Sequence, residues 1–308
     1  MSHSILEVKN IVKKYGSKTA LNNVSLSIPT GSVFGLLGPN GAGKTSLIRI
    51  INQITFPDQG GIFLDGEKLQ PHHVRHIGYM PEERGLYKTM KVGEQALYLA
   101  QLKGISKQEA KKQLDYWFEK FEITDWWDKK IHELSKGMAQ KIQFIVTVLH
   151  QPKLLIFDEP FSGFDPVNAN IIKDEILELK NQGATVIFST HRMESVEELC
   201  DEIALIHKSE KLLDGSLVDI KKQFRSNTFD VGIIAPDSQN LTNILKEKYE
   251  LNTTSFKSLD NELQLSVTLG NRSSNELLQD LLPLGQLTHF TEKIPSINDI
   301  FIQTVTNN

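Results

Sequence analysis

Residues 38–46 read GPNGAGKTS and lie between two apolar runs, SVFGLL and LIRIIN. A glycine-rich turn between a strand and a helix lets backbone N–H groups converge on a phosphate chain at the positive end of the helix dipole. The spacing fits G-x-x-x-x-G-K-[ST], in which the lysine contacts the β- and γ-phosphates and the hydroxyl contacts Mg²⁺. We predict a nucleotide site made of Gly38, Pro39, Asn40, Gly41, Ala42, Gly43, Lys44, Thr45 and Ser46.

Two adjacent acids form a second chemical group. Asp158 and Glu159 end the apolar stretch LLIFDEP. A carboxylate at Asp158 can approach Mg²⁺, and Glu159 can polarise a water for in-line attack on a γ-phosphate. Together with the glycine loop, this pair indicates a nucleoside triphosphatase. No N/T-K-x-D sequence for reading guanine is present, so we expect ATP as the nucleotide.

Three further stretches follow in a fixed order. LSKGMAQK spans residues 134–141, FSGFDP spans residues 161–166 just after the acidic pair and Pro160, and STH ends at His191. With the glycine loop and the acidic pair, these motifs resemble those of the ATP-binding subunits of ABC transporters, over roughly residues 4–220. The resemblance implies ATP and Mg²⁺ as cofactors and a dimer of ATPase subunits.

The resemblance also implies roles for single residues. Ser135 and Gly137 would bind the γ-phosphate of ATP held by the opposite protomer, and Asp165 would communicate between the two sites. His191 would sense the γ-phosphate and hold the attacking water beside Glu159. Tyr15 matches the aromatic residue that stacks on adenine in this family.

Two departures from the family pattern stand out. The usual LSGGQ reads LSKGM, but its serine and second glycine remain, so we expect the γ-phosphate contact to survive. Glu82 stands where the family usually has glutamine. A carboxylate can still approach Mg²⁺, so we predict Thr45, Asp158 and Glu82 as metal ligands. The added negative charge favours slower hydrolysis or a different metal dependence.

The pattern of apolar residues indicates the elements that position these groups. Short strands with turn signals precede the glycine loop, and a helical period runs from Val92 to about His150. KLLIFDEP and GATVIFST then return as continuous apolar strands with a helix between them. We predict an α/β P-loop NTPase domain over residues 1–222, with a helical insert at about 88–150.

The pattern of apolar and polar residues changes in the last part of the chain. Residues 226–308 alternate between apolar-polar strands, such as ELQLSVTLG, and short amphipathic helices. A capping-box pattern runs from Ser273 to Glu276. The order strand, helix, two strands, helix, strand and terminal helix predicts a small ferredoxin-like α+β accessory domain.

Composition narrows the function classes. The net charge is −4 and no basic block is present, so we expect no nucleic-acid partner. The single cysteine, Cys200, suits a reducing compartment. No apolar run approaches the ~18 residues that span a bilayer. We expect a cytoplasmic protein, peripheral on the inner face of the cell membrane.

His72, His73 and His76 lie in a surface turn with no cysteine nearby, and we expect them to be solvated rather than to bind a metal.

These observations favour an ATP-hydrolysing subunit of an ABC transporter that energises translocation by separate membrane-spanning subunits. We expect this permease to dock around residues 82–90, and the ATPase dimer can be homo- or heteromeric. IGYMPEERGLY and the tail IPSINDIFIQTV look like bacterial sodium- and drug-efflux ATPases, which favours export. Two alternatives stay open: the ATPase of an amino-acid importer, and a soluble ABC ATPase acting on a nucleoprotein complex.

Overall fold

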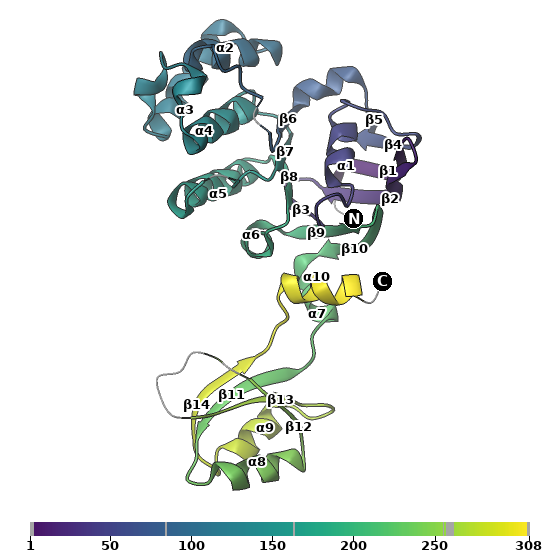
Figure 1. Cartoon of the computed structure of the whole chain (residues 1–308), viewed down its shortest axis with the longest axis vertical. Coiled ribbons are helices and arrows are strands. Elements are labelled where there is room, and N and C mark those ends of the chain that lie inside the picture. Colours follow the sequence, from purple (N-terminus) through teal and green to yellow (C-terminus); the bar gives the residue numbers. More distant parts are fainter. Residues whose placement is uncertain (1–2, 84, 163, 255, 257–261, 307–308) are drawn as a thin grey trace. The chain divides into compact units, whose positions relative to one another are not determined.

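The computed structural model describes residues 3–83, 85–162, 164–254, 256 and 262–306. The chain divides into two compact units, Met1–Leu217 with Thr304–Asn308 and Val218–Gln303 (Figure 1). The division predicted from the sequence, at residues 1–222 and 226–308, stays a prediction about independently folding parts.

A six-stranded sheet forms the centre of the first unit, in the order β10-β9-β3-β8-β7-β6. All neighbouring strands are parallel except β10. β3, β7 and β8 are buried along their whole length, as expected for parallel strands covered on both faces. The strands are β3 (Val33–Leu37), β6 (Ile77–Met80), β7 (Leu154–Asp158), β8 (Thr185–Thr190), β9 (Glu202–His207) and β10 (Glu210–Ser216).

A second, antiparallel sheet has the order β2-β1-β4-β5. Its strands are β1 (Ser4–Tyr15), β2 (Lys18–Pro29), β4 (Gln59–Leu64) and β5 (Glu67–Lys68). One apolar cluster joins residues of both sheets with Leu47, Ile48 and Ile51 of helix α1 (Lys44–Ile51). This shared core fixes the start of α1, and therefore the glycine loop, against both sheets.

Three helices between β6 and β7 form the predicted helical insert and gather as a separate group beside the six-stranded sheet (Figure 1). They are α2 (Val92–Leu102), α3 (Lys107–Lys120) and α4 (Lys136–Val148). Trp127 packs inside this group, 5.5 Å from Phe118 between ring centroids. A Cβ on Gly93 would lie 2.2 Å from the Trp127 ring, so this glycine allows the close approach.

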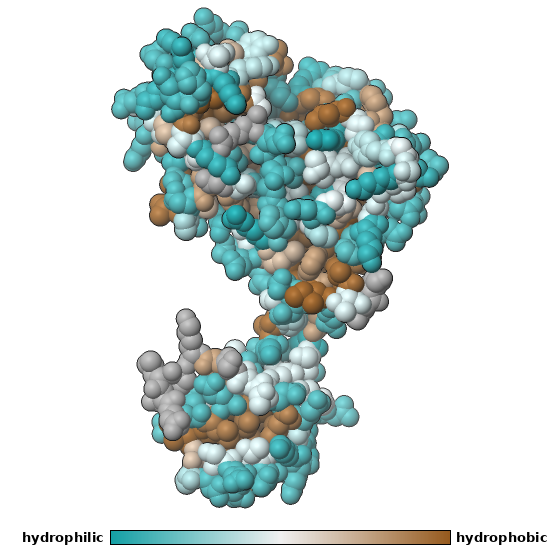
Figure 2. Space-filling view, in the orientation of Figure 1, coloured by the Kyte–Doolittle hydropathy of each residue, from teal (hydrophilic) through white to brown (hydrophobic). Residues whose placement is uncertain are grey.

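The remaining elements of the first unit are short or follow its later strands. They are the 3₁₀ helices η1 (Pro71–His76), η2 (Thr124–Trp126) and η3 (Ile131–Glu133), with α5 (Pro166–Asn181) and α6 (Met193–Leu199). Helix α7 (Leu217–Gln223) begins at the last residue of the unit's main segment. None of the described helices is long and apolar enough to cross a bilayer, and hydrophilic residues cover most of the face in Figure 2.

The second unit has the predicted ferredoxin-like order. Its sheet is β12-β13-β11-β14, antiparallel throughout. Leu265, Val267 and Leu269 lie in its core as the alternation predicted, and the capping box between Ser273 and Glu276 is present. The elements are β11 (Thr228–Ile234), α8 (Ser238–Lys246), β12 (Glu250–Thr253), β13 (Leu263–Thr268), α9 (Ser274–Leu281), β14 (Gln286–Glu292) and α10 (Ile297–Thr306).

Candidate nucleotide site

The glycine loop connects β3 to α1 and needs glycine at two positions. Gly38 has φ +147°, and a Cβ there would lie 2.1 Å from the Ile206 carbonyl oxygen. Gly43 has φ +121°, and its Cβ would lie 2.4 Å from the Ala20 carbonyl oxygen. Both the backbone conformation and the lack of space exclude a side chain. The loop therefore brings its backbone amides close to the first turn of α1, the arrangement that binds phosphates.

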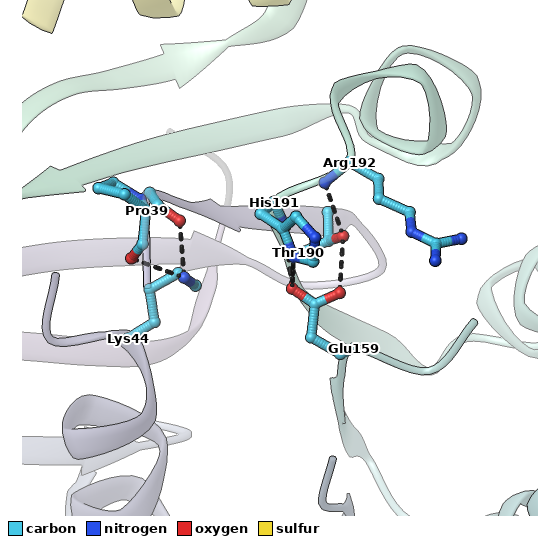
Figure 3. A network of polar contacts seen from close by, with 7 residues as sticks. Pro39, Lys44, Glu159, Thr190, His191 and Arg192 are labelled. Atoms are coloured by element: carbon cyan, nitrogen blue, oxygen red, sulfur yellow. Dashed lines mark hydrogen bonds and ion pairs between the residues drawn. The ribbon is translucent and has the colours of Figure 1, made fainter. Parts of the chain in front are cut away.

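Lys44 begins α1 and turns back over the loop (Figure 3). Its Nζ donates hydrogen bonds to the carbonyl oxygens of Gly38 and Pro39, at 2.6 and 3.2 Å. Burial lowers the pKa of Lys44, and attraction to nearby carboxylates, above all that of Glu159, opposes this effect. The ammonium is thus held inside the loop, where phosphate oxygens would meet it.

A cavity of about 190 Å³ opens beside this loop. It brings together most of the residues predicted from the motifs, although they come from separate parts of the chain. Tyr15, at the end of β1, lies on its wall with the Lys13 ammonium 5.3 Å from the ring centroid. Lys18 and Ala20 also line the cavity, and no sequence motif marks them. The lining is Tyr15, Lys18, Ala20, Asn40, Gly41, Gly43, Lys44, Thr45, Ser46, Glu82, Asp158 and Glu159.

Three carboxylates share this cavity. Asp158, at the end of β7, is 3% exposed, and burial is the main cause that raises its pKa, with Glu82 and Glu159 acting in the same direction. Like charges around one small cavity repel each other unless a cation lies between them. The oxygen donors of Asp158, Glu82 and Thr45 are those that Mg²⁺ prefers. The residues present therefore fit a magnesium ion.

Glu159 has a constrained backbone and a fully engaged carboxylate. Its φ is +51°, a conformation that a non-glycine residue adopts at a cost. Its backbone N–H donates to the Ser189 carbonyl oxygen on the neighbouring strand at 2.9 Å. Oε1 accepts the His191 backbone N–H at 2.9 Å and lies 2.6 Å from His191 Nδ1. The parallel pairing of β7 and β8 thus brings together two residues 32 positions apart.

Thr190 completes this contact network and was not among the predicted site residues. Its Oγ1 donates to Glu159 Oε2 at 3.2 Å and accepts the Arg192 backbone N–H at 3.0 Å (Figure 3). The only sequence signal was its position directly before His191 in the STH stretch.

Seven predicted residues do not line the cavity. Gly38, Pro39 and Ala42 belong to the glycine loop itself, and His191 contacts Glu159. The other three, Ser135, Gly137 and Asp165, lie at the starts of other helices.

Ser135 caps α4, where its Oγ accepts the Met138 backbone N–H at 3.2 Å, and Gly137 lies in the first turn of that helix. Asp165 caps α5, and its hydrogen bonds with Asn168, from side chain and backbone, hold its pKa below the usual value. A second protomer would have to bring these residues to a nucleotide, so their roles stay predictions.

The histidine cluster is not solvated throughout, contrary to our expectation. His72 and His76 are exposed, but His73 is 8% exposed. Glu67, His72 and His73 have possible ligand atoms within 4.8 Å of one another. However, the Gln70 backbone N–H donates to His73 Nδ1 at 2.9 Å. A neutral ring then carries its proton on Nε2, 3.4 Å from a Glu67 oxygen, and Nε2 offers no lone pair to a metal. His73 therefore serves as a cap of η1.

A second cavity, of about 330 Å³, lies between η1, β6 with the segment after it, α2 and α4. Its apolar wall includes Ile54, Leu86, Leu99, Leu102 and Val146. We call this cavity the apolar groove. Residues 85 and 86 belong to the segment, around 82–90, where we expected the permease to dock.

Two basic side chains lie on the floor of the apolar groove. Lys103 Nζ donates to the carbonyl oxygens of Val74 and Ile77, at 3.0 and 2.9 Å, and burial lowers its pKa. His150 Nε2 lies 3.3 Å from the same Ile77 oxygen. Burial lowers the pKa of His150 to about 4, so its imidazole is neutral near pH 7. Among the described residues, buried His150 Nδ1 and Gln143 Oε1 have no hydrogen-bond partner.

Comparison with known proteins matches both units to described families. The family model described as "ABC transporter" matches residues 21–162. The model described as "ATP-binding protein DrrA1-3-like, C-terminal domain" matches residues 215–305.

Relatives match between 69% and 98% of the chain. The uncharacterized ABC transporter ATP-binding protein YhaQ of Bacillus subtilis (strain 168) is 41% identical over 305 residues, 98% of either chain. The linearmycin resistance ATP-binding protein LnrL of the same organism is 36% identical over 227 residues, 73% of either chain. The lantibiotic transport ATP-binding protein SrtF of Streptococcus pyogenes is 32% identical over 216 residues, 69% of this chain and 93% of SrtF.

Solved structures are similar over about 70% of the chain. The ATP-binding subunit of an ABC transporter superposes with a TM-score of 0.67 at 32% identity, covering 72% of this chain and 93% of that one. An ATP-binding cassette of an ABC transporter in its ADP conformation gives 0.61 at 26% identity, covering 69% and 91%.

Proposed function

The chain belongs to the ATP-binding proteins of ABC transporters, and from this premise we propose that it drives export through separate membrane-spanning subunits. As a member of this family it is an ATP-hydrolysing subunit that energises transport. ATP hydrolysis is supported above all by the Glu159 carboxylate. It lies on the wall of the nucleotide cavity and is hydrogen-bonded to His191 and Thr190. Export is supported by relatives whose names state linearmycin resistance and lantibiotic transport.

In the proposed reaction, ATP binds with its phosphates over the glycine loop and its base beside Tyr15. Lys44 exchanges its backbone carbonyl partners for phosphate oxygens, because a charge-assisted bond to phosphate is stronger. Thr45, Asp158 and Glu82 would hold Mg²⁺, whose contribution is to neutralise charge on the β- and γ-phosphates. As the water oxygen bonds to the γ-phosphorus, the bond from that phosphorus to the β–γ bridging oxygen breaks and ADP leaves with that oxygen. Glu159 accepts the proton of the attacking water, and His191 keeps that water in line with the phosphorus.

We propose that two ATPase subunits, of the same or a related chain, act together. Ser135 and Gly137 lie at the N-terminal end of α4 and do not line the cavity of their own chain. A helix N-terminus favours an anion, so each protomer would complete the nucleotide site of the other. Lys136, which replaces the usual glycine, places a further cation at this end.

We also propose that the permease docks in the apolar groove. Its wall is mostly apolar, and His150 is neutral near pH 7, which suits a helix end with an apolar anchor side chain rather than an anionic ligand. Gln143 Nε2 donates to the Pro81 carbonyl oxygen, one residue before Glu82. A partner in the groove would therefore contact the segment that carries a proposed metal ligand. This docking would place the chain at the inner face of the cell membrane.

The test is purification of full-length Glu159→Gln protein with ATP from its own cells in mild detergent. We expect turnover to fall about 10²- to 10⁴-fold, the range for loss of a general base, while ATP binding and dimerisation persist. A membrane protein with several spans should co-purify in stoichiometric amount. Leu102→Asp, which charges the exposed edge of the groove, should lose this partner and keep its ATP affinity.

Other outcomes distinguish the alternatives. Co-purification of ribosomes or DNA-processing proteins would favour a soluble ABC ATPase. A permease that takes up amino acids in reconstituted vesicles would contradict export. Turnover of the Glu159→Gln protein equal to that of the unchanged chain would remove Glu159 from the mechanism.

A further inference from the structure

The two oxygens of the Glu159 carboxylate have different kinds of partner. Oε1 bonds to His191, through its backbone N–H and its ring, while Oε2 accepts a hydrogen bond from Thr190 Oγ1. The His191 side chain is 55% exposed, whereas Thr190 is 1% exposed at the end of β8. One partner is therefore free to turn toward a nucleotide, and the other is fixed in the sheet.

The contacts of the Thr190 hydroxyl determine which acceptor receives its proton. The Arg192 backbone N–H donates to Oγ1 at 3.0 Å, which occupies an acceptor position of the oxygen. A hydroxyl has a single proton to donate, and Glu159 Oε2 is the acceptor at 3.2 Å. The Arg192 amide thus orients the hydroxyl toward the carboxylate.

Glu159 needs such a fixed contact because its backbone alone does not hold the side chain. Its left-handed φ of +51° takes the backbone out of the extended conformation of β7, which ends at Asp158. When the His191 ring turns toward the γ-phosphate, Oε1 loses the ring contact, and the carboxylate is then held by the His191 amide and by Thr190. A general base must keep its lone pair aimed at the water through the reaction.

We propose that Thr190 is a positioning residue for the hydrolysis reaction. The proposal rests on the proposed role of Glu159 as the general base. In it, the Thr190 hydroxyl holds Glu159 Oε2 in place while the His191 ring turns toward the nucleotide. Thr190 touches neither ATP nor the attacking water. Its effect is on the chemical step and not on the binding of ATP.

The test compares steady-state ATP hydrolysis by the full-length chain and its Thr190→Val variant, which keeps the branched shape and removes the hydroxyl. We expect kcat to fall about 10- to 100-fold, the loss expected for a hydrogen bond to a charged group. KM for ATP should stay within about two-fold, because the phosphate loop is unchanged. Thr190→Ser restores the hydroxyl and should keep kcat within about three-fold of the unchanged chain.

Thr185→Val is the matched control. Thr185 lies at the other end of the same strand, is fully buried, and its Oγ1 accepts the Gly31 backbone N–H at 2.9 Å. This variant loses a buried hydroxyl of β8 without touching Glu159, so kcat should not change. Equal losses of kcat in Thr185→Val and Thr190→Val would show general damage to the strand and overturn the proposal.

Further results also decide the question. A Thr190→Val protein with unchanged kcat, or a Thr190→Ser protein as slow as Thr190→Val, would contradict the positioning role. If Thr190→Val does not fold, Thr190→Ala removes the same hydroxyl and must show the same loss of kcat. Glu159→Gln is measured in parallel: a slow Glu159→Gln with a fast Thr190→Val rejects only the role of Thr190, whereas a fast Glu159→Gln rejects the proposed base itself.

Discussion

The nucleotide cavity holds a buried lysine and the apolar groove a partly buried one, and the two sites compensate the charge in different ways. Lys44 lies among the carboxylates of Glu159, Asp158 and Glu82, which oppose the lowering of its pKa by burial. Lys103 bonds to two backbone carbonyl oxygens, and burial is the cause of its lowered pKa. In the groove, His150 has lost its charge near pH 7 altogether.

This difference indicates what each cavity can bind. The nucleotide cavity gathers three carboxylates beside Lys44, and a metal ion that arrives with the phosphate chain would relieve the repulsion between these like charges. The groove has mostly apolar walls and one lysine, Lys103, whose ammonium bonds to backbone carbonyl oxygens, an arrangement that suits a protein surface with little charge. Charged side chains are therefore concentrated in the nucleotide cavity, where we expect hydrolysis, and are few in the apolar groove, where we expect the permease to dock.

Of the changes considered, we expect the largest effects from replacing Lys44 and Lys103 by alanine, one at a time. Lys44→Ala removes a charge-assisted contact to phosphate, and we expect ATP affinity to fall about 100-fold. Lys103→Ala removes one donor from each of two carbonyl oxygens, which keep the Ile77 N–H (on Val74) and His150 Nε2 (on Ile77) as partners. The free energy of unfolding should therefore fall by only about 1 kcal/mol, with ATP affinity retained. Isothermal calorimetry and urea unfolding measure both quantities. An unchanged ATP affinity in Lys44→Ala would overturn the assignment of the loop.

A smaller effect is expected on the pH dependence of folding stability, through His150 in the apolar groove. Because the pKa of His150 is lowered from 6.5 to about 4, the unfolded chain binds a proton between these values that the folded chain does not. Stability should therefore decrease as the pH falls from about 6.5 to 4, by on the order of 2 kcal/mol from this residue. His150→Gln keeps a donor for the Ile77 oxygen and should lose this part of the pH dependence.

Urea unfolding of the unchanged chain and of His150→Gln at several pH values between 4 and 7 tests this expectation. The exposed His72 supplies the control, since His72→Gln should follow the unchanged chain. If the two variants show the same dependence on pH, the groove does not keep His150 neutral.

The smallest effect is expected from Glu82→Gln, which gives position 82 the glutamine that is usual in the family. Glu82 is exposed on the wall of the nucleotide cavity, so solvent screens its charge. We expect a change of about two- to three-fold in the magnesium concentration for half-maximal turnover, in line with the modest strength of exposed charges. Titration of turnover with magnesium measures it. Identical curves would mean that this departure from the family is neutral.

Local patterns made the phosphate loop and the fold class predictable. The loop consists of consecutive residues, and its glycines are required by the conformation and the space at Gly38 and Gly43. The apolar runs of β3, β7 and β8 showed strands covered on both faces, and alternation showed the core face of β13. Each of these signals lies within a few neighbouring residues.

Long-range contacts could not be predicted in the same way. Lys18 and Ala20 line the nucleotide cavity because β2 passes the loop. His73 is 8% exposed, where the sequence suggested solvated histidines, because burial depends on what packs around η1 and not on the local contact with Gln70.

The sequence by itself determined the phosphate loop, the acidic pair and the order of elements, because these depend on local conformation and on periodic burial. Only the tertiary structure decided that Thr190 holds one oxygen of Glu159 and that His150 is neutral. Both outcomes depend on which buried groups face each other across neighbouring elements, and burial changes hydrogen bonding and charge only after the strands and helices have packed.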